Sequence, residues 1–158
     1  MNGMMKLWQA GLLFAAIGMA QGNRGYYRMP EIGPQGLLFV AEGDLWSVPL
    51  AGGMARRLTT HPAEEVGPRI SPDGKTIAFT ANYEGLAEVY TMPSEGGLPK
   101  RRSFGGGTVV GWTPDGKILF RTSQYNGLPS PQLATLADDN TITLIPLSQA
   151  YEGSYSAD

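Results

Sequence analysis

The feature that most constrains this chain is a Pro-Asp-Gly turn that recurs at a spacing of 42 residues. The turn lies in Ile70–Lys75 and again in Trp112–Lys117, and a degenerate copy is found at Gly33–Gly36. Another copy begins at Tyr155–Asp158, about one period after the second. A regular period of 40 to 45 residues with strand-like content is typical of a β-propeller.

Each repeat contains four short segments with the composition and alternation of β-strands. In the clearest repeat, Ile77 and Phe79 alternate with smaller residues after the turn, and Ile118 and Phe120 do so in the next repeat. We expect these four side chains to be buried, and we expect no long helix after residue 25. The predicted strands are 26–29, 36–41, 44–49 and 56–59, then 68–71, 75–81, 88–92 and 99–104, then 109–112, 117–123, 132–136 and 141–145.

The predicted fold class is therefore all-β. It is a β-propeller fragment with about three four-stranded antiparallel blades, plus the first strand of a fourth within 152–158. Three blades cannot close into a ring, and an open array would expose apolar faces at both ends. We expect residues 21–158 to be the N-terminal part of an incomplete propeller in a longer protein.

The first 20 residues have a different composition. Lys6 is the only charged residue before Arg24, and the stretch from Leu7 to Ala20 is apolar apart from Gln9. A basic start, a short apolar core and small residues before Ala20 are typical of a secretory signal peptide. We predict a signal peptide over 1–20 and a mature chain beginning at Gln21, with an uncleaved membrane anchor as the alternative.

The charge and the cysteine count exclude several classes. The net charge is −2, which gives no electrostatic basis for binding nucleic acid or an anionic membrane. The basic run Lys100–Arg102 is short, and we interpret it as a solvated edge strand. Because the chain has no cysteine, it has no disulfide, no thiolate metal site and no lipoprotein anchor. We expect no metal and no cofactor.

Four other motifs favour structural roles over chemistry. His61 is the only histidine and has no serine motif near it, so we predict no catalytic residue in this chain. Asp138–Asp139 precedes Asn140 and favours a hairpin turn, and Gly105–Gly107 favours a flexible connection between blades. Glu64–Glu65 is interpreted as a loop on the blade rim, with attraction of peptide amino termini as the alternative.

Several strings in the chain resemble one family. Ser71–Lys75 followed by Ile77–Phe79 resembles the repeat of the Tol-Pal translocation protein, of tricorn proteases and of prolyl oligopeptidase relatives. The longer strings are similar to the N-terminal propeller of tricorn-type serine proteases. They lie at 27–32, 39–46, 57–62, 68–74 and 110–121, and the resemblance extends over 26–158.

The resemblance implies a large serine peptidase. Its six-bladed N-terminal propeller would precede a second propeller, a PDZ module and a catalytic core with Ser and His, none of which lies within these residues. The implied partners are peptides or unfolded polypeptides, the remaining blades and protease core of the same polypeptide, and a possible homo-oligomer of the parent. Archaeal members are cytosolic, but the predicted signal peptide indicates a periplasmic or secreted protein with no membrane contact after cleavage.

Two arginines on predicted inner strands are candidates for the wall of a peptide channel. Arg28 and Arg69 would meet peptide carboxylates there, and for Arg69 the alternative is a hydrogen bond to the neighbouring blade. Four aromatic residues are expected to pack between blades: Trp46, Tyr90, Trp112 and Phe120.

Two other functions stay open. One is a non-enzymatic interaction propeller like the Tol-Pal protein, although that family places an α/β domain before its propeller. The other is the propeller of a prolyl-oligopeptidase-like hydrolase, which would carry a Gly-x-Ser-x-Gly motif downstream.

Overall fold

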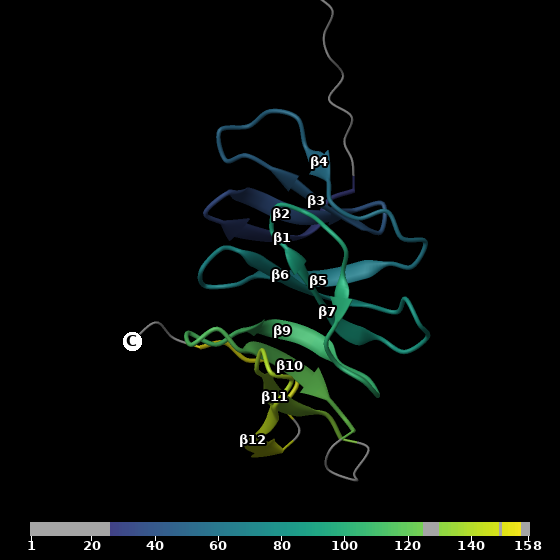
Figure 1. Ribbon diagram of the computed structural model, residues 1–158, viewed down its shortest axis with the longest axis vertical. Coiled ribbons are helices and arrows are strands. Elements are labelled where there is room, and N and C mark those ends of the chain that lie inside the picture. The colour runs from purple at the N-terminus through teal and green to yellow at the C-terminus, as the bar shows by residue number, and fades with distance from the viewer. Residues whose placement is uncertain (1–25, 125–129, 149, 156–158) are drawn as a thin grey trace, which may run out of the picture.

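All regular elements in the described part of the chain are β-strands. The computed structural model describes residues 26–124, 130–148 and 150–155. Three four-stranded antiparallel sheets follow one another along the long axis of the molecule (Figure 1). Blade 1 contains β1 (Arg28–Gly33), β2 (Gly36–Ala41), β3 (Asp44–Val48) and β4 (Arg56–Arg57). Blade 2 contains β5 (Glu65–Ile70), β6 (Thr76–Ala81), β7 (Glu88–Pro93) and β8 (Lys100–Arg101). Blade 3 contains β9 (Thr108–Trp112), β10 (Ile118–Thr122), β11 (Gln132–Leu136) and β12 (Ile142–Ser148).

This arrangement confirms the all-β propeller fragment predicted from the repeat. In every blade the strands are hydrogen-bonded in sequence order, and β1, β5 and β9 are the first strands of their sheets. Strand β5 packs beside β1 on one side and beside β9 on the other, so these three strands line the inner edge of the array.

Several predicted strand boundaries were wrong. The first strand of blade 1 does not cover 26–29. It begins at Arg28 and continues to Gly33, because Gly33 pairs with Gly36 and the hairpin extends to the turn. The outer strands β4 and β8 are only two residues long, because the chain leaves the sheet edge soon after Arg57 and Arg101.

The start of the predicted fourth blade is described only in part. Residues 150–155 carry no strand, and residues 156–158 lie outside the described residues. A Cβ atom at Gly153 would lie 3.1 Å from the Leu133 side chain, so this segment lies against blade 3. The predicted signal peptide over 1–20 also lies outside the described residues.

The Pro-Asp-Gly turns close with the same backbone geometry in blades 2 and 3. The amide of Gly74 donates to the Ser71 carbonyl at 2.8 Å, and that of Gly116 donates to the Thr113 carbonyl at 3.0 Å. Gly74 and Gly116 have φ angles of 73° and 83°. That backbone region is accessible to glycine at low cost, which explains why the turn repeats with its glycine.

The core lies between the blades. The alternation of β6 sends Ile77, Phe79 and Ala81 toward blade 1, where they join one cluster, and sends Ala78 toward blade 3. All four hydrophobic residues predicted to be buried are at most 1% exposed. The blade 1–2 cluster is Leu38, Val40, Leu45, Ile77, Phe79, Ala81, Tyr90 and Met92, and the blade 2–3 cluster is Ala78, Val89, Val109, Ile118, Phe120, Ala134 and Leu136.

Among the described residues, we find no helix with the length and apolarity needed to span a bilayer.

The substitution Phe79→Ala is predicted to lower the free energy of unfolding by about 3–5 kcal/mol, because it leaves a cavity in the blade 1–2 cluster. Leu98→Ala is the control, since Leu98 is 92% exposed and its truncation should change stability by less than about 0.5 kcal/mol. Urea denaturation measures both, and equal effects would contradict a core at this position.

Candidate functional site

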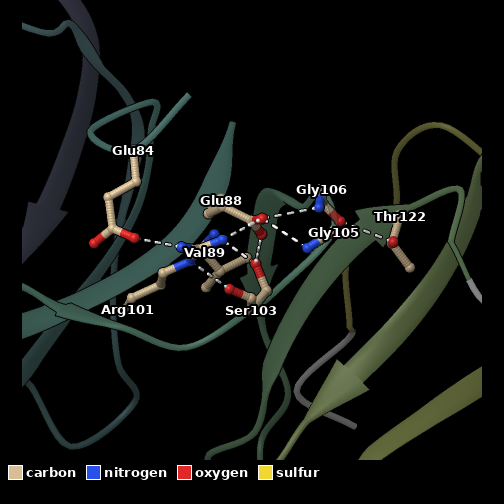
Figure 2. Close-up of polar contacts among 8 residues, drawn as sticks. All are labelled: Glu84, Glu88, Val89, Arg101, Ser103, Gly105, Gly106 and Thr122. Carbon is tan, nitrogen blue, oxygen red and sulfur yellow. Dashed lines mark hydrogen bonds and ion pairs between the residues drawn. The ribbon is translucent and has the colours of Figure 1, made fainter. Parts of the chain in front are cut away.

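The most densely bonded polar site in the described residues is a buried carboxylate where blade 2 meets blade 3. Glu88 is the first residue of β7 and is fully buried. The connection from β8 to β9 passes beside it through Ser103, Gly105 and Gly106 (Figure 2).

Four donors converge on the Glu88 carboxylate (Figure 2). The Ser103 hydroxyl donates to Oε2 at 2.5 Å. The backbone amides of Gly105 and Gly106 donate to Oε1 at 2.8 and 3.0 Å, and Arg101 Nη2 donates to the same oxygen at 2.9 Å. A buried charge needs such complete pairing, because leaving water without it costs several kcal/mol.

The network continues into the strands on both sides. The Val89 amide donates to the Ser103 hydroxyl oxygen at 2.9 Å, and the Thr122 hydroxyl of β10 donates to the Gly106 carbonyl at 2.9 Å. Arg101 also donates to a carboxylate oxygen of Glu84 at 2.5 Å. The site therefore joins β7 and β8 of blade 2 to β10 of blade 3 through the connection that precedes β9.

The environment of Glu88 favours its ionised form. Burial raises its pKa, but the hydrogen bonds from Ser103, Gly106, Arg101 and Gly105 together outweigh burial. The net result is that the pKa of Glu88 lies below its ordinary value.

A second buried carboxylate lies where blade 1 meets blade 2. Glu65 is fully buried at the start of β5, so the prediction of a loop on the blade rim was wrong for this residue. Its two oxygens accept hydrogen bonds from the Thr59 hydroxyl and the Tyr83 hydroxyl, each at 2.5 Å. Burial raises the pKa of Glu65 and exceeds the opposing effect of these two donors. Burial, followed by the bond to Glu65, also raises the pKa of Tyr83.

The two predicted channel arginines lie on the inner strands and are partly exposed. Arg28 on β1 is ion-paired with Glu64, which immediately precedes β5. Arg69 on β5 donates through Nε to the Val110 carbonyl of blade 3 at 3.1 Å. Its Nη1 lies 3.9 Å from a carboxylate oxygen of Glu31 on β1. Arg69 of β5 thus contacts both neighbouring inner strands, β1 and β9. Its contact with β9 is the hydrogen bond to the neighbouring blade that the sequence analysis gave as the alternative.

Three of the four aromatic residues predicted to pack between blades make contacts between blades. Trp112 donates from Nε1 to the Arg69 carbonyl at 3.0 Å, and Tyr90 and Phe120 belong to the two interblade clusters. Trp46 belongs to neither interblade cluster, and its Nε1 donates to the Ala41 carbonyl within blade 1.

The basic run is not simply a solvated edge. Arg102 is only 8% exposed, and its guanidinium donates to the Ala137 carbonyl at 2.9 Å and to the Asn140 side chain at 3.2 Å. Arg102 therefore fastens blade 2 to a turn of blade 3. That turn is the hairpin predicted at Asp138–Asp139, closed by the Asn140 amide bonding the Ala137 carbonyl at 3.0 Å.

His61 lies on the surface beside the blade 1–2 junction. Its Nδ1 accepts a hydrogen bond from the Ala63 amide at 3.0 Å, and the centre of its ring lies 4.0 Å from the centre of the Tyr83 ring. In the described part of the chain, no group of three or more metal-ligating side chains is found.

The comparisons with known proteins agree with this fold. Residues 24–158 match the family described as the tricorn protease N-terminal β-propeller domain, and the chain belongs to that family. Tricorn protease homolog 1 from Streptomyces coelicolor is 41% identical over 97 residues, covering 60% of this chain and 9% of the relative. The putative tricorn-like protease N-terminal subunit from Sulfurisphaera tokodaii is 29% identical over 144 residues, covering 85% of this chain and 73% of the relative.

Solved structures show the same architecture. The crystal structure of the tricorn protease matches with a TM-score of 0.72 at 22% identity, over 84% of this chain and 14% of that one. A putative TolB from Agrobacterium tumefaciens matches with a TM-score of 0.67 at 26% identity, over 76% of this chain and 46% of that one. The chain thus spans 9% of tricorn protease homolog 1 and 14% of the tricorn protease in the crystal structure, but 73% of the tricorn-like N-terminal subunit.

Sequence reasoning missed the buried carboxylates as a site. A signal was present, because Asp44, Arg57 and Thr59 recur 44 residues later as Glu88, Arg101 and Ser103. An acid, an arginine and a hydroxyl at a fixed spacing in two repeats indicate a shared polar contact. The sequence alone gives no indication that this contact is buried.

The two buried carboxylates are predicted to respond to pH in opposite directions. Because the pKa of Glu88 is lowered, its ionised form stabilises the fold above the ordinary pKa of 4.5, and this stabilisation is lost as pH falls through the folded value. Glu88→Gln should therefore lower the free energy of unfolding at pH 7 by about 1.5–3 kcal/mol, and by less below pH 4.

For Glu65 the raised pKa reverses the sign, because the folded state favours the protonated acid. Wild type should therefore gain stability relative to Glu65→Gln as pH falls through the folded pKa, and should lose that advantage above it. Urea titrations of both variants between pH 3 and 8 measure these profiles. If the stability difference from wild type changed with pH in the same direction for both variants, the opposite pKa shifts of Glu88 and Glu65 would be contradicted.

Proposed function

We propose that this chain is the N-terminal propeller portion of an exported tricorn-like serine peptidase, and that it supports the access of peptides to a catalytic core elsewhere in the protein. The observation that carries the proposal is the family match over residues 24–158. The relatives named as tricorn proteases or their homologues are much longer than this chain. The proteolytic activity belongs in this proposal to the parent protein, with the remaining blades, the protease core and a possible homo-oligomer as its partners.

Peptide contact is assigned to the inner edge of the blades. Arg28 and Arg69 lie there with Glu31 and Glu64, and the side chains of these four residues are between 30% and 52% exposed. Partly exposed charges of both signs on neighbouring strands are suited to peptide termini and side chains. The described residues of this edge carry no nucleophile–base pair, which is consistent with a supporting role.

A second candidate is a non-enzymatic interaction propeller. The structural match to a putative TolB favours it, because that protein is similar over 76% of this chain. The two proposals differ in whether the polypeptide that contains this chain hydrolyses peptides.

Purified residues 21–158 should cleave no peptide substrate, because among the described residues the His61 ring accepts its hydrogen bond from the Ala63 amide and is not bonded to a serine hydroxyl that it could activate. The parent protein should cleave peptides and be blocked by a serine-directed inhibitor. A parent without peptidase activity would favour the interaction propeller. Hydrolysis by residues 21–158 that is lost in His61→Ala would overturn both the supporting role and the interpretation of His61.

Replacing the inner-edge arginines tests the channel directly. In the parent peptidase, Arg28→Ala and Arg69→Ala should each raise KM for long acidic peptides by about 3–10-fold and leave kcat unchanged, since they remove binding and no reacting group. Lys75→Ala on an exposed turn is the matched control and should change neither constant. Unchanged KM in both arginine variants would exclude them from peptide contact.

Export follows in this proposal from the basic and apolar segment at the N-terminus. N-terminal sequencing of the exported protein should begin at Gln21, in the periplasm or the medium. Recovery of a soluble protein that still begins at Met1 would contradict export.

A further inference from the structure

The two blade junctions have the same backbone frame. The amide after the first residue of the third strand donates to a hydroxyl that follows the fourth strand: Leu45 to Thr59 at 2.8 Å, and Val89 to Ser103 at 2.9 Å. The next blade begins with an amide bonded to the residue before the third strand, Glu65 to Gly43 and Gly107 to Ala87, both at 2.8 Å. Corresponding positions can therefore be compared one by one.

The carboxylate that fills this frame comes from opposite sides in the two junctions. Where blade 1 meets blade 2, the Thr59 hydroxyl donates to Glu65 at 2.5 Å, and Glu65 belongs to the following blade. Where blade 2 meets blade 3, the Ser103 hydroxyl donates to Glu88 at 2.5 Å, and Glu88 belongs to the preceding blade. Each hydroxyl thus has one buried carboxylate as its acceptor.

In each junction, the residue that faces the glutamate has a shorter side chain than its counterpart in the other junction. Gly107 corresponds to Glu65, and a Cβ atom there would lie 2.8 Å from the Ser103 hydroxyl oxygen and 3.2 Å from the Val89 side chain. Asp44 corresponds to Glu88 but is one methylene shorter. It pairs with Arg57, and its Oδ1 is buried with no hydrogen-bond partner in the described part of the chain.

We infer that each junction selects its two blades by whether the glutamate comes from the preceding blade or from the following blade. A Glu88-type edge accepts a blade that begins with glycine, and an Asp44-type edge accepts a blade that begins with glutamate. Exchanging the neighbours would place two glutamates in one buried frame, or would leave a frame with no glutamate to accept from its hydroxyl. Two like charges repel, and a frame without the glutamate leaves the buried hydroxyl donor without an acceptor. The junctions are therefore not interchangeable, which restricts the wrong blade pairings to which repeat proteins are prone.

Moving the carboxylate across one junction tests this inference. In the full chain, Gly107→Glu should raise the unfolding equilibrium constant by at least about a hundredfold, because it adds a carboxylate to an occupied frame. In the Glu88→Ala background, Gly107→Glu should raise the unfolding equilibrium constant by a factor at least about tenfold smaller than in the wild type, because the frame then holds no other glutamate. Urea denaturation measures both, and effects of Glu88→Ala and Gly107→Glu that simply multiply would overturn the inference.

The first junction gives an independent test if Gly107→Glu does not fold. Asp44→Glu should destabilise the wild type and stabilise the Glu65→Ala variant by at least about threefold in the unfolding constant, since the longer side chain then supplies the missing acceptor. Asp138→Glu makes the same chemical change at a fully solvated position and should combine additively with Glu65→Ala. Asp44→Glu having the same sign in both backgrounds would overturn the inference.

Discussion

The blade array depends, at each junction, on one buried glutamate that accepts the hydrogen bond of the junction hydroxyl. Hydrophobic packing between blades is non-directional, so it holds two sheets together without fixing how the chain passes from one to the next. Glu88 fixes that passage because it binds the amides of Gly105 and Gly106 and the hydroxyl of Ser103 at the same time. Leu45 and Val89, whose amides bond to the frame hydroxyls, also belong to the two apolar clusters, so each polar frame adjoins its core.

Arginines fasten the same blades at the inner and outer edges. At the inner edge, Arg69 and Trp112 bond across β5 and β9 in both directions. At the outer edge, Arg56 donates to the Glu95 carbonyl of blade 2 at 2.7 Å, and Arg102 reaches a turn of blade 3. Each junction is thus held at its inner edge, its buried frame and its outer rim. Such an arrangement holds the inner edge in place, as the proposed contact with peptides would require.

The sequence predicted the architecture because its signals are local and repeated. The turn at Ile70–Lys75 and its copy 42 residues later give the blade period, and the alternation around Phe79 gives the buried faces. The carboxylate frames could not be derived in this way, because they form between segments of two different blades. Glu65 and Arg102 looked solvated in the sequence for that reason, although both are buried.

A two-residue difference in spacing has its origin in the same frames. The turns repeat every 42 residues, whereas Asp44 and Glu88 are 44 apart. The connection from Thr59 to Glu65 is six residues and that from Ser103 to Gly107 is four, which accounts for the difference. The longer connection occurs where the carboxylate comes from the following blade. The irregular spacing in the sequence therefore marks the place where the junction type changes.

Residue-resolved amide hydrogen exchange tests most directly whether buried carboxylates hold the blades together. The amides of Gly105 and Gly106 lie in a connecting loop but donate to Glu88. At neutral pH they should exchange at least about a hundredfold more slowly than the amide of Gly53 in the exposed loop before β4, and at rates near those of core amides such as Phe79. Exchange of Gly105 and Gly106 as fast as that of Gly53 would contradict the central role of the junction carboxylate.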